Sequence, residues 1–238
     1  TSMTMAAMCG KNSEGVRRLS GKRLFIYGAG GLGRDVLRLS RRINRESTRW
    51  SEISFVDDGC LKKEINGAPV LRFDVYLAQR REDDVFVIAT GETVVRKQLW
   101  EKLAAQGIPL ETLVSPEVYL DEFDTLHPGC VLTEGTILGG NNTFGLCSYV
   151  NLGCQIGHNT SLGDFSMLSP GCIVSGEVTI GEDTYIGTGA VIRNQVTIGK
   201  NCIIGMGSLV TKDIPDNVVA YGSPCRIVRE NTDGKVFR

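Results

Sequence analysis

This chain of 238 residues has few histidines, almost no net charge and no long apolar run. Histidine occurs only at positions 127 and 158, and no two cysteines are spaced as C-x-x-C, which argues against a zinc cluster. The net charge is −1, so bulk electrostatics favour neither nucleic acid nor an anionic membrane as a partner. No apolar run reaches the roughly 18 residues that a membrane span needs. We therefore expect no metal site, no nucleic acid and no membrane.

The eight cysteines do not suggest a disulfide framework. Four of them, at 130, 154, 172 and 202, occupy one slot of the repeat described below, where we expect small buried side chains. So many unpaired thiols suit a reducing compartment, which predicts a cytoplasmic location. Residues 1–22 lack the apolar core of a signal peptide, and we expect a disordered tail or a cloning remnant there.

The sequence is rich in a six-residue repeat. From Leu132 to Val210 every sixth residue is a bulky aliphatic or Phe, over fourteen hexads without an insertion or deletion. The residue two positions earlier is small or β-branched, and glycine often follows the aliphatic directly, where we expect it to form a tight turn. A period of six fits neither a helix nor an ordinary strand. It is typical of a parallel β-helix in which three hexads close one coil.

Residues 23–114 follow a different pattern, in which strands and helices alternate. Apolar stretches at 23–27, 53–56 and 85–89 predict strands, and stretches at 34–43 and 93–106 predict helices. This alternation predicts a parallel sheet with ligands at the carboxyl ends of its strands. The expected fold is an α/β Rossmann-like domain at 23–114, a parallel β-helix at 115–229 and a C-terminal tail at 230–238.

A glycine-rich turn joins the first predicted strand to the first predicted helix. Gly28, Gly30 and Gly33 match G-x-G-x-x-G, and the acidic residue Asp57 ends the second strand. Glycines let backbone N–H groups approach a phosphate, and the helix N-terminus adds partial positive charge. Three interpretations stay open: a phosphorylated ligand such as a nucleotide-sugar, the NAD(P) of an oxidoreductase, or a purely structural turn. The hexads argue against a dehydrogenase, which needs a fuller Rossmann fold and a catalytic domain.

His158 is the candidate for chemistry on the β-helix. Its neighbours one coil below and above are Gly140 and Gly176, so the imidazole would stand in a notch free of other side chains. Histidine, with an ordinary pKa of about 6.5, can accept a proton near neutral pH. Asn151, one wall earlier, puts a polar group where a turn glycine is usual. His127 precedes the repeat and is expected to be a loop residue.

These features together resemble the hexapeptide-repeat sugar acyltransferases of the PglD/NeuD type, a family of nucleotide-amino-sugar N-acetyltransferases and sialic acid O-acetyltransferases. The resemblance covers roughly residues 22–229. It rests on GAGGLG at 28–33, FVDD at 55–58, IATG at 88–91, the N-x₆-H from Asn151 to His158, the hexads, and IPDNVVAYGSPCRIVR at 214–229. The resemblance implies a left-handed β-helix, a homotrimer with active sites between subunits, and acetyl-CoA as co-substrate in a groove along the coils.

The resemblance also assigns roles to residues. His158 would be the general base that takes a proton from the acceptor amine or hydroxyl, with Asn159 and Asn151 as further catalytic residues. The acceptor would attack the thioester directly, without an acyl-enzyme. The nucleotide-sugar would contact Gly30, Gly31, Leu32, Asp57, Asp58 and Gly91. Coenzyme A would contact Met167, Gly176, Thr188, Met206 and Arg226.

Three positions depart from the family pattern. Asn159 stands where an acidic residue often strengthens the base, so that Asp164 or another subunit would have to compensate. Met167 replaces a second histidine near the thioester, and Leu32 replaces a histidine in the glycine turn. An amine needs less help than a hydroxyl to lose its proton, which favours N-acetylation of a UDP- or dTDP-linked amino-sugar. The alternatives are O-acetylation of a sialic-type sugar and a non-catalytic protein that binds nucleotide-sugars.

Overall fold

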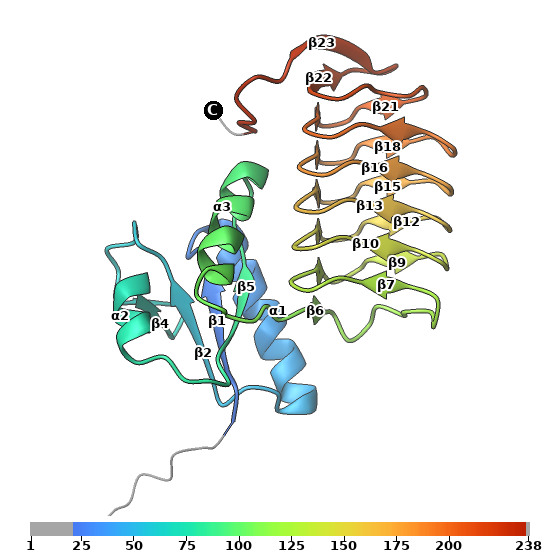
Figure 1. The fold of residues 1–238 in the computed structure, drawn as a ribbon. Coiled ribbons are helices and arrows are strands. Elements are labelled where there is room, and N and C mark those ends of the chain that lie inside the picture. The colour runs from blue at the N-terminus through green and yellow to red at the C-terminus, as the bar shows by residue number, and fades with distance from the viewer. Residues whose placement is uncertain (1–20, 237–238) are drawn as a thin grey trace, which may run out of the picture.

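The computed structural model describes residues 21–236, so the tail predicted for residues 1–22 lies almost entirely outside the described residues. Figure 1 shows a small α/β domain beside a column of stacked coils. The strand that leads out of the α/β domain, β6 (Leu113–Val114), already pairs with a strand of the column, β8 (Val131–Leu132). In this part of the chain, no helix is long and apolar enough to cross a membrane.

The α/β domain is built on a five-stranded sheet in the order β3-β4-β2-β1-β5. Its strands are β1 (Arg23–Tyr27), β2 (Glu52–Val56), β3 (Glu64–Ile65), β4 (Ala68–Leu71) and β5 (Val85–Ile88). Its helices are α1 (Gly31–Ser47), α2 (Phe73–Ala78) and α3 (Thr93–Ala104). As predicted, β1, β2 and β5 run parallel; β3, β4 and α2 are too short for a hydrophobic period to reveal them in the sequence.

The order of the strands reverses at β1. The chain passes from β1 to β2 and β4 on one side, and then crosses to β5 on the other side of β1. Ligands of open α/β sheets bind at such a switch point, outside the carboxyl ends of the two neighbouring strands. Here the switch point brings together the glycine turn after β1 and the turn at Thr90 and Gly91 after β5.

The column is a left-handed parallel β-helix with three walls, as predicted. The domain wall, which faces the α/β domain, contains β8 (Val131–Leu132), β11 (Tyr149–Val150), β14 (Met167–Leu168), β17 (Tyr185–Ile186) and β20 (Ile203–Ile204), flanked by β6 and by β22 (Val218–Tyr221) and β23 (Arg226–Glu230). The apolar wall contains β9 (Ile137–Leu138), β12 (Gln155–Ile156), β15 (Ile173–Val174), β18 (Val191–Ile192) and β21 (Leu209–Val210). The polar wall contains β7 (Thr125–Leu126), β10 (Thr143–Phe144), β13 (Ser161–Leu162), β16 (Thr179–Ile180) and β19 (Thr197–Ile198).

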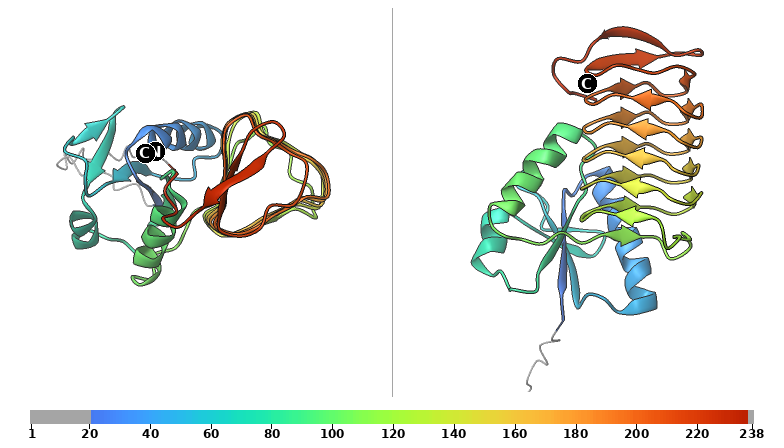
Figure 2. Two further views of the ribbon diagram at one scale, coloured as in Figure 1. Left: turned by 90° about the horizontal axis from the view of Figure 1, so that it is seen from above. Right: turned by 45° about the vertical axis from the view of Figure 1, so that its right-hand side comes forward.

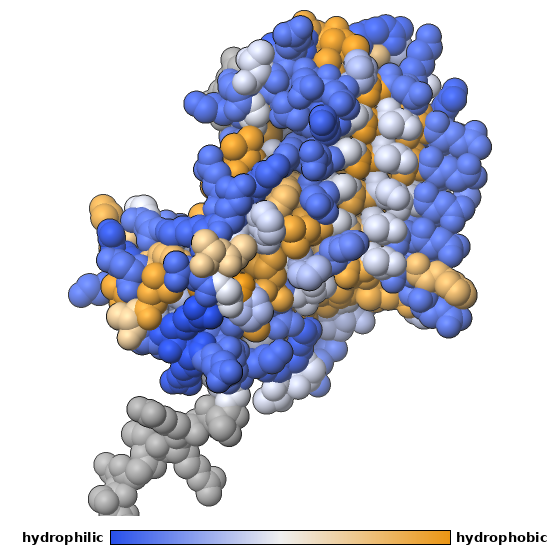
Figure 3. Space-filling view, viewed as in Figure 1, coloured by the Kyte–Doolittle hydropathy of each residue, from blue (hydrophilic) through white to orange (hydrophobic). Residues whose placement is uncertain are grey.

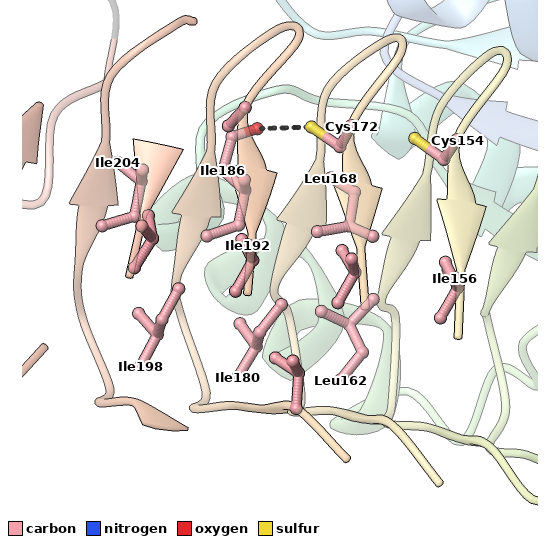
Figure 4. Packing of buried hydrophobic residues seen from close by; sticks show 14 of the residues in the cluster. Cys154, Ile156, Leu162, Leu168, Cys172, Ile180, Ile186, Ile192, Ile198 and Ile204 are labelled. Atoms are coloured by element: carbon pink, nitrogen blue, oxygen red, sulfur yellow. Dashed lines mark hydrogen bonds between the residues drawn. The ribbon is translucent and has the colours of Figure 1, made fainter. Parts of the chain in front are cut away.

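The hexad residues fill the interior of the coil. Residues 18 apart are paired in register, for example Thr143 with Ser161, so identical positions of successive coils stack directly. Figure 4 shows the resulting ladders of aliphatic side chains, with Cys154 and Cys172 stacked in the small-residue slot. All four cysteines of this slot are 0 % exposed, which confirms that they serve as small core residues. In Figure 3 the stacking appears as vertical columns of neutral and apolar side chains beside a hydrophilic edge.

The glycines that follow the aliphatic residues are needed for a different reason from the one predicted. None of them has a positive φ; that conformation recurs two positions later, where Asn159, Phe165 and Asp183 also adopt it. A Cβ on Gly157 would instead come within 2.4 Å of the backbone nitrogen of Gly176 in the next coil. These glycines are therefore required by the close approach of successive coils and not by a turn.

The α/β domain packs against one wall and two corners of the triangular coil. Figure 2 shows α1 against the corner between the domain wall and the apolar wall, and α3 against the corner between the polar wall and the domain wall. Tyr149 and Met167 of the domain wall join the core of the α/β domain, while Trp100 of α3 packs on Phe165, with ring centroids 5.4 Å apart. The third corner, between the apolar and polar walls, lies on the side of the coil away from the α/β domain. We call these the α1 corner, the α3 corner and the outer corner.

Candidate functional site

His158 lies at the outer corner, two residues after the end of β12. Its imidazole is exposed and lies across Gly176: a Cβ at position 176 would come 2.7 Å from Nε2 and 2.8 Å from Cε1. The predicted notch is therefore present on this side. On the other side, a Cβ at Gly140 would meet only the carboxylate of Asp121, at 3.7 Å. The imidazole occupies the space that a side chain at position 176 would fill, and it stays open to solvent.

Asn159 is the hydrogen-bonding partner of this ring, with Nδ2 3.2 Å from Nδ1 of His158. When the amide nitrogen donates, Nδ1 accepts and the ring proton resides on Nε2. A base that works through Nε2 needs the opposite arrangement, in which the amide oxygen accepts from Nδ1–H. Asp164 does not compensate within the chain, because it lies at the α3 corner, where its Oδ1 accepts from the backbone N–H of Leu146 at 2.7 Å.

Asn151 does not meet His158 within one chain. It follows β11 at the α1 corner, is 7 % exposed, and its Oδ1 accepts from the backbone N–H of Leu152 at 2.8 Å. Thr188 and Met206 stack at the same corner, since the N–H of Gly207 donates to the carbonyl oxygen of Thr188. Thr188 is exposed and the Met206 side chain is 79 % exposed, so both are accessible to a ligand.

Met167 is placed differently from the other residues predicted to bind coenzyme A. Its side chain is 4 % exposed, lies in the seam between the α/β domain and the coil, and its Sδ accepts from Nη2 of Arg96 at 3.5 Å. The structure thus leaves little of this side chain for a cofactor to contact. Tyr149, in the same wall, is fully buried in the seam as well.

Arg226 borders a cleft of about 330 Å³ at the end of the outer corner, together with Lys212 and Asp213. Lys212 stacks three coils above His158, because the two positions differ by three times the 18-residue coil. At about 4.8 Å per strand spacing, this separates the imidazole from the basic cleft by roughly 14 Å. Arg193 lies on the same corner, beside Lys212. Sequence reasoning missed both residues, although the 18-residue period places Lys212 in line with His158 and Arg193 in line with the adjacent Gly157.

The glycine turn after β1 contains two kinds of glycine. Gly28 has a φ of 109°, and a Cβ on Gly33 would come 2.0 Å from the carbonyl oxygen of Gly28, so both are required by the fold. Gly30 and Gly31 have open space where a Cβ would stand. Gly30 is the N-cap of α1 and offers no side-chain cap, which leaves the positive end of the helix available to an anion. Leu32 turns away from this space and packs, half-buried, against the core shared with the domain wall.

Asp57 braces the glycine turn. Its Oδ2 accepts from the N–H of Ala29 at 2.8 Å, and its Oδ1 accepts from the N–H of Gly59 at 2.9 Å. Gly91 is half-buried at the switch point, after β5. These two residues and the open glycines thus surround the carboxyl ends of β1 and β5.

Asp58 is engaged in a network of its own. It accepts hydrogen bonds from the Tyr27 hydroxyl at 3.1 Å, from Nζ of Lys102 at 2.9 Å and from the N–H of Phe73 at 2.8 Å. Partial burial of the carboxyl raises its pKa, but these hydrogen bonds together outweigh burial and hold the pKa below its usual value. Asp58 therefore anchors the start of α2 and the last turn of α3. Within residues 21–236, no three metal-ligating side chains gather closely enough to bind a metal ion.

Comparison with known proteins gives two family matches. Residues 23–103 match the PglD N-terminal domain, and residues 177–212 match the bacterial transferase hexapeptide family, over six repeats. No curated protein sequence gives a match.

Several solved structures are similar over most of the chain. WeeI from Acinetobacter baumannii AYE is 32 % identical, with a TM-score of 0.80, over 87 % of this chain and 100 % of its own. The acetyltransferase domain of PglB from Neisseria gonorrhoeae FA1090, solved in complex with acetyl coenzyme A, is 29 % identical, with a TM-score of 0.81, over 87 % of this chain and 100 % of its own. PerB from Caulobacter crescentus, solved in complex with CoA and GDP-perosamine, is 27 % identical, with a TM-score of 0.79, over 88 % of this chain and 98 % of its own.

Proposed function

Because this chain belongs to the hexapeptide-repeat sugar acyltransferases of the PglD type, we propose that it transfers the acetyl group of acetyl-CoA to the amino group of a nucleotide-linked amino-sugar. The acetyl coenzyme A bound to the PglB domain and the GDP-perosamine bound to PerB support this choice of substrates. One observation on this chain carries the proposal. An open glycine turn at a switch point and an exposed histidine set against a glycine occur in the same polypeptide.

The nucleotide-sugar would bind at the switch point of the α/β domain. Its diphosphate would approach the N-terminus of α1 at Gly30 and Gly31, where no side chain stands in the way. Asp57, which already holds the turn through Ala29, and Gly91 would border the nucleoside. We expect UDP or dTDP as the nucleotide, and a panel of nucleotides in the assay tests this choice.

Acetyl-CoA would lie along the outer corner. The roughly 14 Å between His158 and the cleft of Lys212 and Arg226 fits a cofactor with a thioester at one end and phosphates at the other. Gly176, just above the imidazole, would leave room for the thioester. Cationic side chains at the far end would pair with the phosphates.

The transfer then needs only one proton acceptor. The amine nitrogen of the sugar attacks the thioester carbonyl carbon while Nε2 of His158 takes a proton from that nitrogen. When the tetrahedral intermediate collapses, the C–S bond breaks and the imidazolium returns the proton to the departing thiolate. For this, Asn159 must present its amide oxygen to Nδ1–H, which keeps Nε2 free of a proton.

We propose that the complete site forms between subunits of a homotrimer. His158 lies at the outer corner, on the opposite side of the coil from the glycine turn of its own chain. Asn151, Thr188 and Met206 lie at the α1 corner. The apolar wall, which joins these two corners, exposes Ile137, Ile173 and Leu209 by 64, 40 and 37 %. A second copy that covers this wall would bring its own outer corner toward the α1 corner of the first.

The test measures thiol release from acetyl-CoA with a panel of UDP-, dTDP- and GDP-linked amino-sugars, for wild type and His158→Ala. We expect turnover with at least one acceptor and a loss of about 10²-fold or more in the variant. Turnover only with acceptors that carry a hydroxyl in place of the amine would replace this proposal with O-acetylation. Tight binding of a nucleotide-sugar without any turnover would point to a non-catalytic binding protein.

A further inference from the structure

Arg96 is the largest fully buried side chain of the described residues, at 1 % exposed, and it lies in the seam between the two domains. Within the described residues no carboxylate forms an ion pair with it, and its Nε has no hydrogen-bonding partner. A buried guanidinium without a counter-charge is costly, since burial disfavours the charged form and lowers its pKa. An apolar residue at position 96 would avoid this cost, but it could not donate the hydrogen bonds that Arg96 makes.

The second buried arginine of the chain shows the contrast. Arg23, at 4 % exposed, is held by both carboxylate oxygens of Asp84, at 2.8 and 2.7 Å. Arg23 lies at the start of β1, at the end of the sheet away from the glycine turn. This ion pair is fully accounted for as a structural contact.

Arg96 instead joins three separate segments. Its Nη2 donates to the carbonyl oxygen of Thr90 at 2.8 Å, in the turn that leads to Gly91. Its Nη1 donates to the carbonyl oxygen of Cys147 at 3.0 Å, at the α3 corner of the coil. Its Nη2 also contacts Sδ of Met167, and its guanidinium carbon lies 5.3 Å from the centre of the Tyr149 ring. One rigid group thus fixes the turn after β5 relative to two coils.

We propose that Arg96 is a positioning residue that holds the turn after β5 against the coil, so that the nucleotide-sugar site keeps a fixed place relative to the coil. This inference rests on the proposed function, because it takes Gly91 as part of that site. The planar guanidinium suits the role, since its donors leave in fixed directions and reach carbonyl groups on both domains at once. A lysine would reach one of them, and a methionine would reach neither.

The test compares Arg96→Met and Arg96→Lys with wild type and with Arg23→Lys. Binding of UDP, dTDP, GDP and acetyl-CoA is measured by calorimetry, and KM and kcat are measured with the best acceptor. We expect nucleotide binding and the KM of the sugar to weaken by about tenfold or more in Arg96→Met, and by less in Arg96→Lys, with acetyl-CoA binding unchanged. Arg23→Lys should lower the melting temperature and leave nucleotide binding at the wild-type level.

Two results would overturn the inference. Arg96 variants that bind nucleotide as wild type does would make Arg96 a structural residue only. Equal loss of nucleotide and acetyl-CoA binding would mean general unfolding of the seam. Wild type that neither binds a nucleotide nor turns over would instead refute the proposed function.

If the variants do not fold, hydrogen exchange on wild type tests whether the nucleotide site is coupled to the coil. Nucleotide should then slow the exchange of amides around Cys147 as well as those around Gly91. Protection confined to the α/β domain would refute the coupling.

Discussion

At the scale of single residues, the position and hydrogen bonding of the His158 ring depend on the glycine above it and the amide beside it. Asn159 adopts a φ of 55°, a conformation that Asn and Asp both tolerate. The amide can pair with the ring in two ways, and only one of them leaves Nε2 free as a base. In the proposed mechanism, the side chain at position 159 therefore determines what fraction of the protein has Nε2 of His158 free to accept a proton.

Asn159→Asp should increase kcat/KM for acetyl transfer by about tenfold, because a carboxylate accepts only from Nδ1–H and stabilises the imidazolium that forms. The measurement is the rate of thiol release under subsaturating acceptor. Asn159→Gly, which keeps the backbone conformation and removes the side chain, is the control and should not exceed wild type. An unchanged rate in Asn159→Asp would show that the base is oriented by another subunit.

Gly176→Ala should reduce kcat by about 10- to 100-fold, because its Cβ would come 2.7 Å from Nε2 and push the imidazole out of place. The ring is exposed and can move, so the melting temperature should change little. Gly140→Ala is the matched control on the other side of His158, where a Cβ meets nothing closer than 3.7 Å. Equal activity in both variants would contradict the assigned position of the ring.

The notch around His158 was predictable, since an 18-residue period places Gly140 and Gly176 on either side of it. Arg96 was not predictable. It is followed by Lys97 and Gln98, and in the sequence it looks like a residue of a solvated helix surface. Its burial results from the packing of α3 on the coil, which depends on three-dimensional contacts between segments about 50 residues apart.

At the scale of elements, the coil was predictable and the short pieces of the α/β domain were not. Each wall strand of the coil repeats the same six-residue pattern, so fourteen weak signals add up. β3, β4 and α2 have no repeat to strengthen their signal, and α2 is six residues long. The role of the coil glycines was also missed, because a sequence pattern shows that glycine recurs and not which atoms come close to it.

A substitution at the N-terminus of α1 should weaken nucleotide binding without lowering the stability of the protein. Gly30→Asp should leave the melting temperature unchanged or slightly raised, since the N-cap has an extended φ of −74° and an Asp caps a helix a few tenths of a kcal/mol better than Gly. The same carboxylate should repel a diphosphate and raise the KM of the nucleotide-sugar by about tenfold or more. Calorimetric binding of the nucleotide checks this. Unaltered affinity would place the diphosphate elsewhere.

At the scale of the whole molecule, the two halves of the proposed site lie on opposite sides of the coil. The α/β domain covers the domain wall, and His158 stands at the corner that this domain leaves free. The sequence predicted both halves, yet it contained no information on which wall the α/β domain would cover. In the structure Val131, Tyr149 and Met167 of the domain wall pack into the core of the α/β domain, while the outward aliphatic residues of the apolar wall stay exposed.

A site shared between chains predicts complementation. When His158→Ala and Gly30→Asp chains are co-expressed in equal amounts and assemble at random, about one quarter of all sites should pair an intact glycine turn with an intact histidine. At subsaturating nucleotide-sugar, the activity of the mixture should therefore recover to about that fraction of wild type, above the activity of either variant alone. A mixture no more active than its parents would place the complete site within one chain.

The in-register stacking of coils also fixes the distances between positions along a corner of the coil. Every position on a corner is separated from the next by one coil of 18 residues, so His158 and the cleft of Lys212 and Arg226 can be set apart only in whole steps. A cofactor that is bound at both ends fits only one separation, and therefore only one number of coils between the two points. If acetyl-CoA spans these two points as proposed, insertions between them must either bulge outward at a corner or come as complete coils that change the length of cofactor that fits.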